Sequence, residues 1–285
     1  MDLPTDLRRR LGDELVAALR ALDVPVVAAT QLSGTGYPGY RPRACRIDAA
    51  DGRVLKGRLF ASAAGAERAE YVARHLGPHA VPAPLMRSGA ALLTEWVEGP
   101  PPTTAPAMLR QCGGLQAAVH TQSVADDCPH RRRTTMERRW ALLEQRTGEL
   151  VDSSALDAGE ARAALELARR YAPSTCTIGF ILGDFCAENA VVSQSGEVLF
   201  IDNDTLSIDA REYDLARTWY RWPMNAAERA AYLEGYTARC SVDLFDAHFL
   251  YWAIAVLIGG ALFRRRLHVD GAAEPLRRLR ALLAE

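Results

Sequence analysis

The sequence predicts an α+β protein with two lobes, a β-rich lobe over residues 1–98 and a larger, mostly helical lobe over residues 99–285. Short apolar runs separated by turn residues fill the first third of the chain, whereas apolar residues with helical spacing dominate the rest. The segment EGPPPTTAP at 98–106 lies between the two patterns, and its proline and threonine content is typical of a hinge. A chain of 285 residues is long for one core and long enough for two lobes.

The first lobe is expected to begin with a helix and to continue as strands around a second helix. Leucines recur every three or four residues from Leu3 to Leu22, which predicts one amphipathic helix. A further helix is expected over residues 64–76, and the VPAP segment after it is expected to end it. The expected strands are the apolar runs at 24–30, 44–47, 54–61 and 91–97.

The second lobe is expected to be helical with one hairpin. The apolar run that stops at Asp184 and the run Val198–Ile201 are expected to pair across a turn at Ser195-Gly196. The expected helices are 107–122, about 135–150, 157–171, 212–221, 226–239, 244–267 and 274–283.

Charge and composition exclude several classes of protein. The formal net charge is −1, so neither nucleic acid nor an anionic membrane surface is expected as a partner. The N-terminus has no apolar signal core, and the longest apolar run, Phe249–Phe263, is too short to span a membrane. The six cysteines form no CxxC pair, which favours reduced thiols in a cytoplasmic protein. The sequence sets no oligomeric state.

Three polar residues bracket the expected hairpin. Asp184 and Asn189 have the D-x4-N spacing of a catalytic loop, in which the acid accepts a proton from an attacking hydroxyl and the amide oxygen binds a metal. Asp202 ends the next apolar run, where it is placed to hold Mg²⁺ that bridges nucleotide phosphates. Each residue alone is more often turn or capping chemistry. Because one short hairpin brings all three together, the combination predicts phosphoryl transfer.

Lys56 is the only lysine in a chain with 33 arginines, and it lies in the expected strand 54–61. A lysine there is expected to bind the α- and β-phosphates of a nucleotide and to pair with a glutamate of the following helix. The alternative is a surface lysine on an edge strand. The glutamate is Glu67 or Glu70, which share a helix face. Glu70 is preferred, because Glu67 lies in the first turn and can complement the helix dipole.

The loop LSGTGYPGY precedes the lysine strand and carries Gly34 and Gly36. Its backbone N–H groups are compatible with phosphate binding. A flexible hairpin tip is an equally good interpretation, because the spacing is not G-x-G-x-x-G.

Together these motifs resemble the aminoglycoside phosphotransferase and choline kinase-like family. The family pattern is HGDxxxxN, a hairpin, IDW or IDF, and then YDLA. The matching residues here are Leu182-Gly183-Asp184, Asn189, Ile201-Asp202-Asn203 and Tyr213-Asp214-Leu215-Ala216. The resemblance implies a bilobal protein-kinase-like fold, ATP and Mg²⁺ as cofactors, and a small-molecule hydroxyl acceptor such as an antibiotic, a sugar or an amino alcohol.

The resemblance also implies roles for individual residues. Asp184 would be the catalytic base, and Asn189 and Asp202 would bind magnesium. Asp214 would brace the catalytic loop. The hinge 93–97, through the backbone of Glu95 and Val97, would hydrogen-bond adenine.

The chain departs from the family pattern at two positions. Leu182 stands where the family has histidine, and Asp209 is displaced by one position from a common acid. Asp204 is interpreted as a cap of the following loop rather than a spare charge near the metal. The acceptor is expected near Glu188 and the segment 217–223. The arginines at 131–133 and 138–139 are compatible with an anionic substrate, but a solvated helix face is the preferred interpretation.

The leading hypothesis is therefore an ATP- and Mg²⁺-dependent phosphotransferase that acts on a hydroxyl of a small molecule. The main alternative, suggested by Leu182 and the irregular glycine loop, is a nucleotide-binding protein with weak or no catalytic activity. A metal-dependent hydrolase that uses Asp184 and Asp202 would leave Lys56 unexplained.

Overall fold

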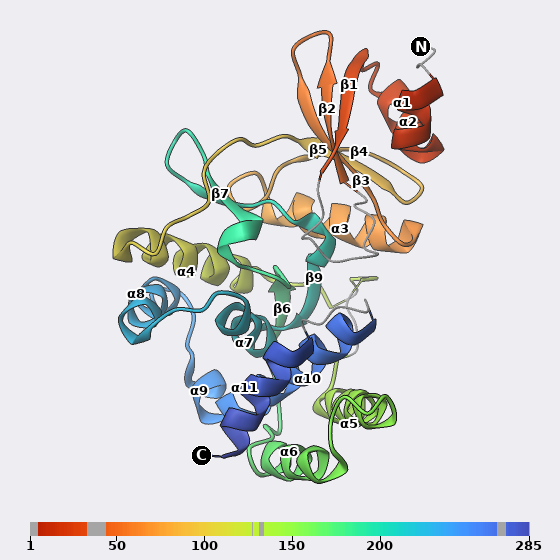
Figure 1. Ribbon diagram of the computed structural model, residues 1–285. Helices are drawn as coiled ribbons and strands as arrows, with labels where there is room; N and C mark the ends of the chain where they lie inside the picture. The colour runs from red at the N-terminus through yellow and green to blue at the C-terminus, as the bar shows by residue number, and fades with distance from the viewer. Residues whose placement is uncertain (1–4, 33–43, 127, 131–133, 267–271, 285) are drawn as a thin grey trace.

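The computed structural model describes all residues except 1–4, 33–43, 127, 131–133, 267–271 and 285 (Figure 1). It confirms the α+β class: a five-stranded antiparallel sheet at the N-terminal end is followed by a mostly helical part. The last strand of the sheet in sequence ends at Glu95 and the next helix begins at Pro106. The lobe boundary at residues 98 and 99 falls between them and stays a prediction.

The N-terminal sheet has the strand order β1-β2-β3-β5-β4. Its strand β4, which begins at Pro84, was not expected from the sequence. Proline is tolerated at the first residue of an edge strand, and the register shifts between Pro84 and Met86. The strands are β1 (Val26–Gln31), β2 (Ala44–Ala49), β3 (Val54–Leu59), β4 (Pro84–Ser88) and β5 (Ala91–Glu95).

The expected N-terminal helix is divided at Gly12 into α1 (Thr5–Leu11) and α2 (Asp13–Ala21). Gly12 has φ +77°, a left-handed conformation that interrupts a helix and that glycine adopts without a Cβ penalty. Helix α2 packs on the sheet, where Leu15 joins Leu55 in the core of this lobe.

Alternate residues of strand β3 face opposite sides of the sheet. Leu55 and Gly57 face the core under α2, and a Cβ at Gly57 would lie 2.8 Å from the Ile47 Cδ1 atom. Successive side chains on a strand point to opposite faces. Lys56 and Arg58 therefore point away from that core, toward the second lobe.

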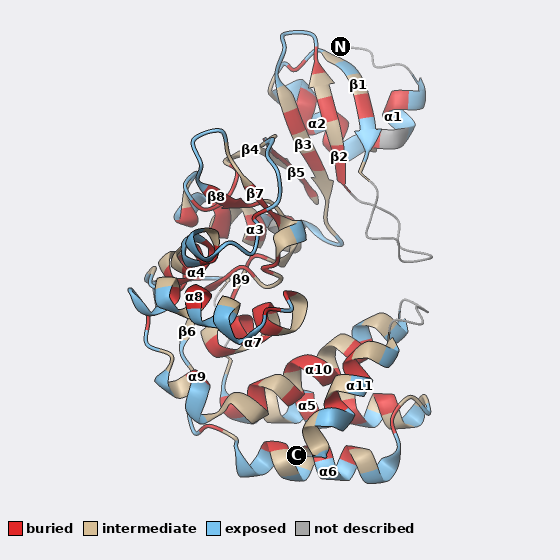
Figure 2. Ribbon diagram, turned by 60° about the vertical axis from the view of Figure 1, so that its left-hand side comes forward, coloured by how far each residue is buried: buried red, intermediate tan, exposed pale blue. Residues whose placement is uncertain are grey.

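Helix α3 (Ala63–Leu76) connects the two lobes. Ser62 caps it by accepting a hydrogen bond from the Gly65 amide, at 3.2 Å. Its buried face, which includes Val72 and Leu76, belongs to the core of the C-terminal lobe rather than to that of the sheet. Figure 2 shows α3 lying between the sheet and the helices of the second lobe.

The segment after β5 is fixed to the second lobe. The amide of Val192 donates to the carbonyl of Pro100 at 2.9 Å. A Cβ at Gly99 would lie 2.0 Å from the Val192 carbonyl oxygen, so only glycine permits this approach. The expected hinge is thus held against a strand of the C-terminal lobe at this point.

Eight helices in the described part of the C-terminal lobe surround a large apolar core. The helix expected over 244–267 is divided near His248. No helix in the described residues is both long enough and apolar enough to span a membrane. The helices are α4 (Pro106–His120), α5 (Met136–Asp152), α6 (Ala158–Arg170), α7 (Arg211–Arg221), α8 (Ala226–Thr237), α9 (Asp243–Ala247), α10 (Phe249–Arg266) and α11 (Ala273–Leu283).

Two small antiparallel sheets replace the single expected hairpin. Strands β7 (Ala190–Val192) and β8 (Val198–Phe200) form a hairpin, and Gly196 has φ +84° in its turn. The apolar run before Asp184 is not part of it. That run is β6 (Ile178–Ile181), which pairs with β9 (Ser207–Ala210), a strand that the sequence analysis missed.

Candidate active site

Asp214 on α7 holds the loop that follows β6. The backbone amides of Leu182 and Gly183 donate to its two carboxylate oxygens at 3.2 and 2.7 Å. Gly183 has φ +81°, and a Cβ there would lie 2.4 Å from the Thr205 carbonyl oxygen. The glycine of the LGD motif is therefore required by both backbone conformation and space.

Side chains of α4 complete the environment of Asp214, which is fully buried. His120 Nε2 and Gln116 Nε2 lie 2.9 and 3.0 Å from the Asp214 Oδ2 atom. Burial alone would raise the pKa of Asp214, but the hydrogen bonds from His120, Gln116 and Gly183 lower it below its ordinary value. Leu182 itself is buried in the apolar core, so Asp214 and backbone amides order this loop without a histidine at position 182.

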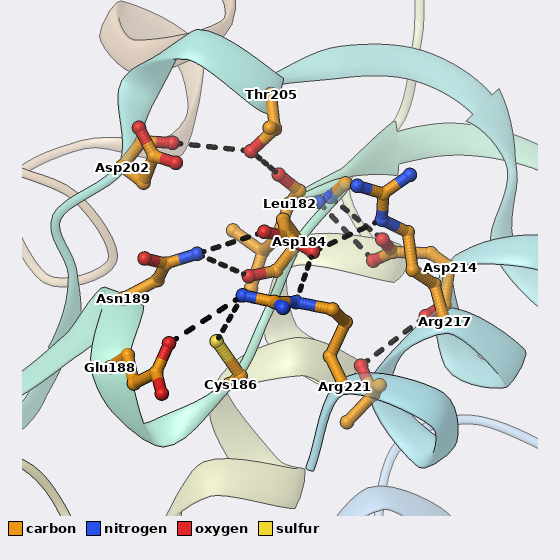
Figure 3. Close-up of polar contacts among 12 residues, drawn as sticks. Leu182, Asp184, Cys186, Glu188, Asn189, Asp202, Thr205, Asp214, Arg217 and Arg221 are labelled. Atoms are coloured by element: carbon orange, nitrogen blue, oxygen red, sulfur yellow. Dashed lines mark hydrogen bonds and ion pairs between the residues drawn. The ribbon is translucent and has the colours of Figure 1, made fainter. Parts of the chain in front are cut away.

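Asn189 positions Asp184, the proposed catalytic base (Figure 3). Its Nδ2 donates to the Asp184 carbonyl at 2.9 Å and to the Asp184 Oδ2 atom at 3.1 Å. Because the amide nitrogen is used in this way, the planar amide leaves its oxygen on the opposite side. An oxygen so placed is suitable as a ligand for Mg²⁺.

Two arginines of α7 also contact Asp184. The Nε atoms of Arg217 and Arg221 lie 3.1 and 3.0 Å from the Asp184 Oδ1 atom. Burial alone would lower the pKa of Arg217, but Asp184 and Tyr213 raise it above its ordinary value. The sequence analysis placed Arg217 near the acceptor and did not predict these ion pairs. The four-residue spacing from Tyr213, which puts all three residues on one helix face, was the available signal.

Lys56 reaches from the sheet to the second lobe. Its Nζ donates to the carbonyl of Ile201 at 2.5 Å, next to Asp202. Burial lowers the pKa of Lys56 to about 8, with Asp202 opposing and Arg58 reinforcing this shift. Lys56 and Asp202, both predicted from the sequence, therefore lie close together, although they are far apart in the chain.

The expected pair between Lys56 and Glu70 is not formed in this structure. Glu70 instead accepts hydrogen bonds from Arg74 and Arg87, both at 2.8 Å. Arg87 belongs to β4, the strand that the sequence analysis missed, so this competitor could not be foreseen. Glu67, the other candidate, is exposed on α3. A contribution of Glu70 to nucleotide binding stays a prediction.

Asp202 and Asp204 lie beside Arg58 of β3. Arg58 Nη1 is 3.7 Å from the Asp202 Oδ1 atom, and Arg58 Nη2 is ion-paired with Asp204. The expectation that Asp204 caps the following loop was therefore wrong, because its carboxylate is turned toward a guanidinium. Thr205 Oγ1 donates to the carbonyls of Leu182 and Asp202, and it thereby joins the two loops.

The donor set fits magnesium coordination through few protein ligands. Asn189 offers an amide oxygen and Asp202 a carboxylate, and Mg²⁺ commonly takes its remaining ligands from phosphates and water. The described residues contain no cluster of three or more His, Cys, Asp or Glu side chains able to hold a metal by themselves.

The segment after β5 provides a candidate edge for adenine. The Glu95 and Trp96 amides donate to the carbonyls of Ala83 and Val54, each at 3.2 Å. Within the described parts of the chain, the Val97 amide has no backbone partner. The roles of Glu95 and Val97 stay predictions. Gly34 and Gly36 lie outside the described residues.

A model of the phosphotransferase enzyme family matches residues 37–248, a span that includes Lys56, the Asp184 loop, Asp202 and Asp214. This chain belongs to that family. The resemblance seen in the sequence motifs is thereby confirmed. A comparison of this phosphotransferase with curated proteins gave no match.

Solved structures show the same fold. Choline kinase LicA from Streptococcus pneumoniae is 15% identical with a TM-score of 0.69, over 93% of this chain and 96% of that one. Macrolide 2'-phosphotransferase type I is 16% identical with a TM-score of 0.68, over 99% and 98%. Amicoumacin kinase hAmiN, in complex with AMP-PNP, Ca²⁺ and Ami, is 14% identical with a TM-score of 0.63, over 98% and 96%. At these identities the likeness of the phosphotransferase to each structure establishes its fold alone.

Proposed function

We propose that this phosphotransferase transfers the γ-phosphoryl group of ATP, in the presence of Mg²⁺, to a hydroxyl of a small molecule. The observation that carries the proposal is the contact of Lys56 with the Ile201 carbonyl, across 145 positions of sequence. It brings the only lysine of the chain beside Asp202. Thr205 joins the Asp202 loop to the loop of Asp184, which supports a common site for the three residues proposed as cation, metal ligand and proton acceptor.

Each of these residues meets an electrostatic demand of phosphoryl transfer. Lys56 donates hydrogen bonds to nucleotide phosphates, and Asn189 and Asp202 hold Mg²⁺. When bound, the magnesium nucleotide supplies the electrophilic phosphorus and a neutralised leaving group. Among the solved relatives, amicoumacin kinase hAmiN was solved with AMP-PNP and Ca²⁺, which supports a nucleotide and a divalent cation in this fold.

Asp184 is the proposed proton acceptor. As the acceptor oxygen forms its bond to the γ-phosphorus and the bond to the ADP oxygen breaks, the hydroxyl proton passes to the Asp184 carboxylate. The Nδ2 group of Asn189 donates to the Asp184 Oδ2 atom and so fixes the orientation of the carboxylate. Asp214 holds the backbone just before Asp184 by accepting hydrogen bonds from the Leu182 and Gly183 amides.

A second candidate is nucleotide binding without turnover. The specific observation in its favour is that Arg217 and Arg221 both contact the Asp184 Oδ1 atom. The two contacts occupy a carboxylate oxygen that would otherwise be open to an acceptor hydroxyl. Transfer is the first candidate because the lysine and both acids that phosphoryl transfer needs are all present in the chain.

The test combines turnover with binding. ADP release is measured over a panel of hydroxyl acceptors, and Mg-ATP affinity is measured separately by calorimetry. We expect Asp184→Ala to lower kcat by about 10²- to 10⁴-fold while Mg-ATP affinity stays within about threefold. Asp152→Asn, at an exposed position near the end of α5, is the matched control and should leave both unchanged.

Two results would decide against phosphoryl transfer. Full turnover in Asp184→Ala would remove that residue from the mechanism. Tight Mg-ATP binding with no ADP release on any acceptor would support the second candidate.

A further inference from the structure

Helix α7 places two arginines beside Asp184, where the acceptor is expected to bind. Tyr213, Arg217 and Arg221 follow one another at four-residue intervals along α7, so they lie on one face of the helix. Arg217 and Arg221 flank Asp184, as Figure 3 shows. Among the described residues, the one other carboxylate that an ion pair places here is Glu188, which is 74% exposed and 3.6 Å from Arg221.

Arg217 has N–H donors that Asp184 does not use. Its Nε atom is used by Asp184. Its two terminal nitrogens have no hydrogen-bond partner among the described residues, and its side chain is 34% exposed. A guanidinium presents its donors as a rigid fork that matches the two oxygens of a carboxylate or a phosphate. Arg217 can therefore hold Asp184 through one edge and bind an anion through the other.

A cavity of about 620 Å³ lies between α5, α7 and α10. Tyr213 lines it one helical turn from Arg217. Three arginines, Arg138, Arg139 and Arg146, line it as well, with Asp209 as the one acid among its lining residues.

The walls of the cavity are ordered. Arg139 is ion-paired with Asp209, and its guanidinium carbon lies 4.9 Å from the Tyr213 ring centroid. With only 10% of its side chain exposed, Arg139 does not belong to a solvated helix face, so the preferred sequence interpretation was wrong at this position. Tyr251, which is 1% exposed, lines the same cavity, and its hydroxyl has no hydrogen-bond partner in the described residues. A buried polar group in that state is available for a ligand.

The α7 face beside Asp184 and the cavity together carry an excess of positive charge. Counting only residues that the structure describes, this region holds five arginines (Arg138, Arg139, Arg146, Arg217 and Arg221) and three carboxylates (Asp184, Asp209 and Glu188). The chain as a whole has a net charge of −1, so this excess is local to the acceptor side. A cationic acceptor would meet repulsion there, whereas an anionic one would be attracted and oriented.

We propose that the acceptor carries an anionic group, a carboxylate or a phosphate, in addition to its hydroxyl, and that Arg217 binds this group while Asp184 receives the hydroxyl. The proposal rests on the proposed function and narrows its substrate class. Because the anion would bind the terminal nitrogens of Arg217, the contact between Arg217 Nε and Asp184 can persist in the complex.

The test uses a matched set of six-carbon acceptors that differ in charge: glucose, glucosamine, glucuronate and glucose 6-phosphate. The kcat/KM of the full chain is measured for each by ADP release at saturating Mg-ATP. We expect at least one anionic acceptor to exceed glucose by about tenfold or more, and glucosamine to fall below glucose. Glucuronate and glucose 6-phosphate separate a carboxylate site from a phosphate site.

Arg217→Gln then tests the residue. We expect it to raise KM for the preferred anionic acceptor by about 10- to 100-fold and to change KM for glucose little. The ratio of kcat/KM between the anionic and neutral acceptors cancels any effect of the substitution on Asp184. Arg110→Gln, which removes an exposed arginine of α4 paired with Glu234 of α8, is the matched control and should leave the ratio unchanged.

A preference for glucosamine or glucose would overturn the inference and leave the proposed function standing. An equal loss of kcat on all acceptors in Arg217→Gln would also overturn it, because Arg217 would then act on the transferred phosphoryl group. Equilibrium binding of glucuronate and glucose 6-phosphate, followed by thermal shift with Mg-ADP present, gives a readout without turnover. Anion binding that Arg217→Gln abolishes would support the inference even if no acceptor were phosphorylated.

Discussion

At the scale of single residues, Lys56 shows how the fold prepares a cation for phosphate. The side chain leaves the sheet, loses most of its contact with water and donates to a backbone carbonyl. Burial disfavours its charged form, and the pKa falls to about 8. Bound phosphates would supply the missing negative charge, so they would raise the pKa again.

The pH dependence of nucleotide binding tests this account. Below pH 8 the lysine is already protonated, so its titration should not change the affinity for Mg-AMP-PNP. Above pH 8 the free protein must take up a proton in order to bind. Affinity should then fall by up to about tenfold per pH unit. Calorimetry in buffers of different ionisation enthalpy measures the affinity and the proton uptake together.

The control for this experiment is Lys56→Met, which should bind more weakly and show neither the step above pH 8 nor the proton uptake. A wild-type affinity that is constant from pH 7 to 9 would show that Lys56 does not contact the phosphates.

The same scale shows which site residues the sequence could reveal. Lys56, Asp184, Asn189 and Asp202 were predictable because a motif or a unique residue type marks each one. The ion pairs of Arg217 were not predicted, because arginine is abundant in this chain and the four-residue spacing from Tyr213 was only a weak signal. Its importance comes from a three-dimensional neighbour, Asp184, that only the fold supplies.

At the scale of elements, helices α4 and α8 pack so closely that their backbones are in contact. A Cβ at Gly113 would lie 2.0 Å from the Tyr232 carbonyl oxygen, and one at Gly235 would lie 2.0 Å from the Arg110 carbonyl oxygen. This close approach also aligns the polar groups of the two helices. Tyr236 of α8 lies 2.7 Å from the Nδ1 atom of His120, whose other nitrogen contacts Asp214.

Two neighbouring glycines of α4 give a matched pair of variants. Gly113→Ala should lower the free energy of unfolding by about 2–3 kcal/mol, because a backbone carbonyl cannot move aside as a side chain can. Gly114→Ala places its Cβ 3.8 Å from the Gly235 carbonyl oxygen, an ordinary contact, and should raise stability by about 0.5–1 kcal/mol through helix propensity. Denaturant unfolding measures both. Equal effects would show that the helices are not packed this closely.

Elements differed in how well the sequence predicted them. Helix α6 was predicted closely, because its capping box with Asp157 and Glu160 marks its start. Strand β4 was missed because its first residue is a proline that, read alone, indicates a break. Strand β9 was missed because its four residues pair only with β6, a partner that is distant in sequence. Local signals thus predict elements that begin with a local motif, and fail where a strand depends on a remote partner.

At the scale of the whole molecule, polar contacts bring the two lobes together at the candidate active site. Lys56 and Arg58 of β3 both reach residues that follow β8. The amide of Phe200 also donates to the carbonyl of Ala80, beyond α3, at 2.9 Å. The lobe interface and the proposed metal site therefore share the segment around Asp202, so the ion that binds there must compete with the N-terminal lobe for its ligands.

Arg58 is the competitor that this arrangement identifies. Its guanidinium is ion-paired with Asp202 and Asp204, and its side chain is 15% exposed, so solvent screens the pairs only in part. Arg58→Gln should lower the Mg²⁺ concentration needed for half-maximal nucleotide binding by about tenfold, because the carboxylates would no longer be neutralised by the protein. Arg53→Gln, which removes an arginine from the exposed β2–β3 turn, should leave the Mg²⁺ requirement unchanged. A higher Mg²⁺ requirement in Arg58→Gln, or loss of nucleotide affinity at saturating Mg²⁺, would instead mean that Arg58 binds phosphate beside Lys56.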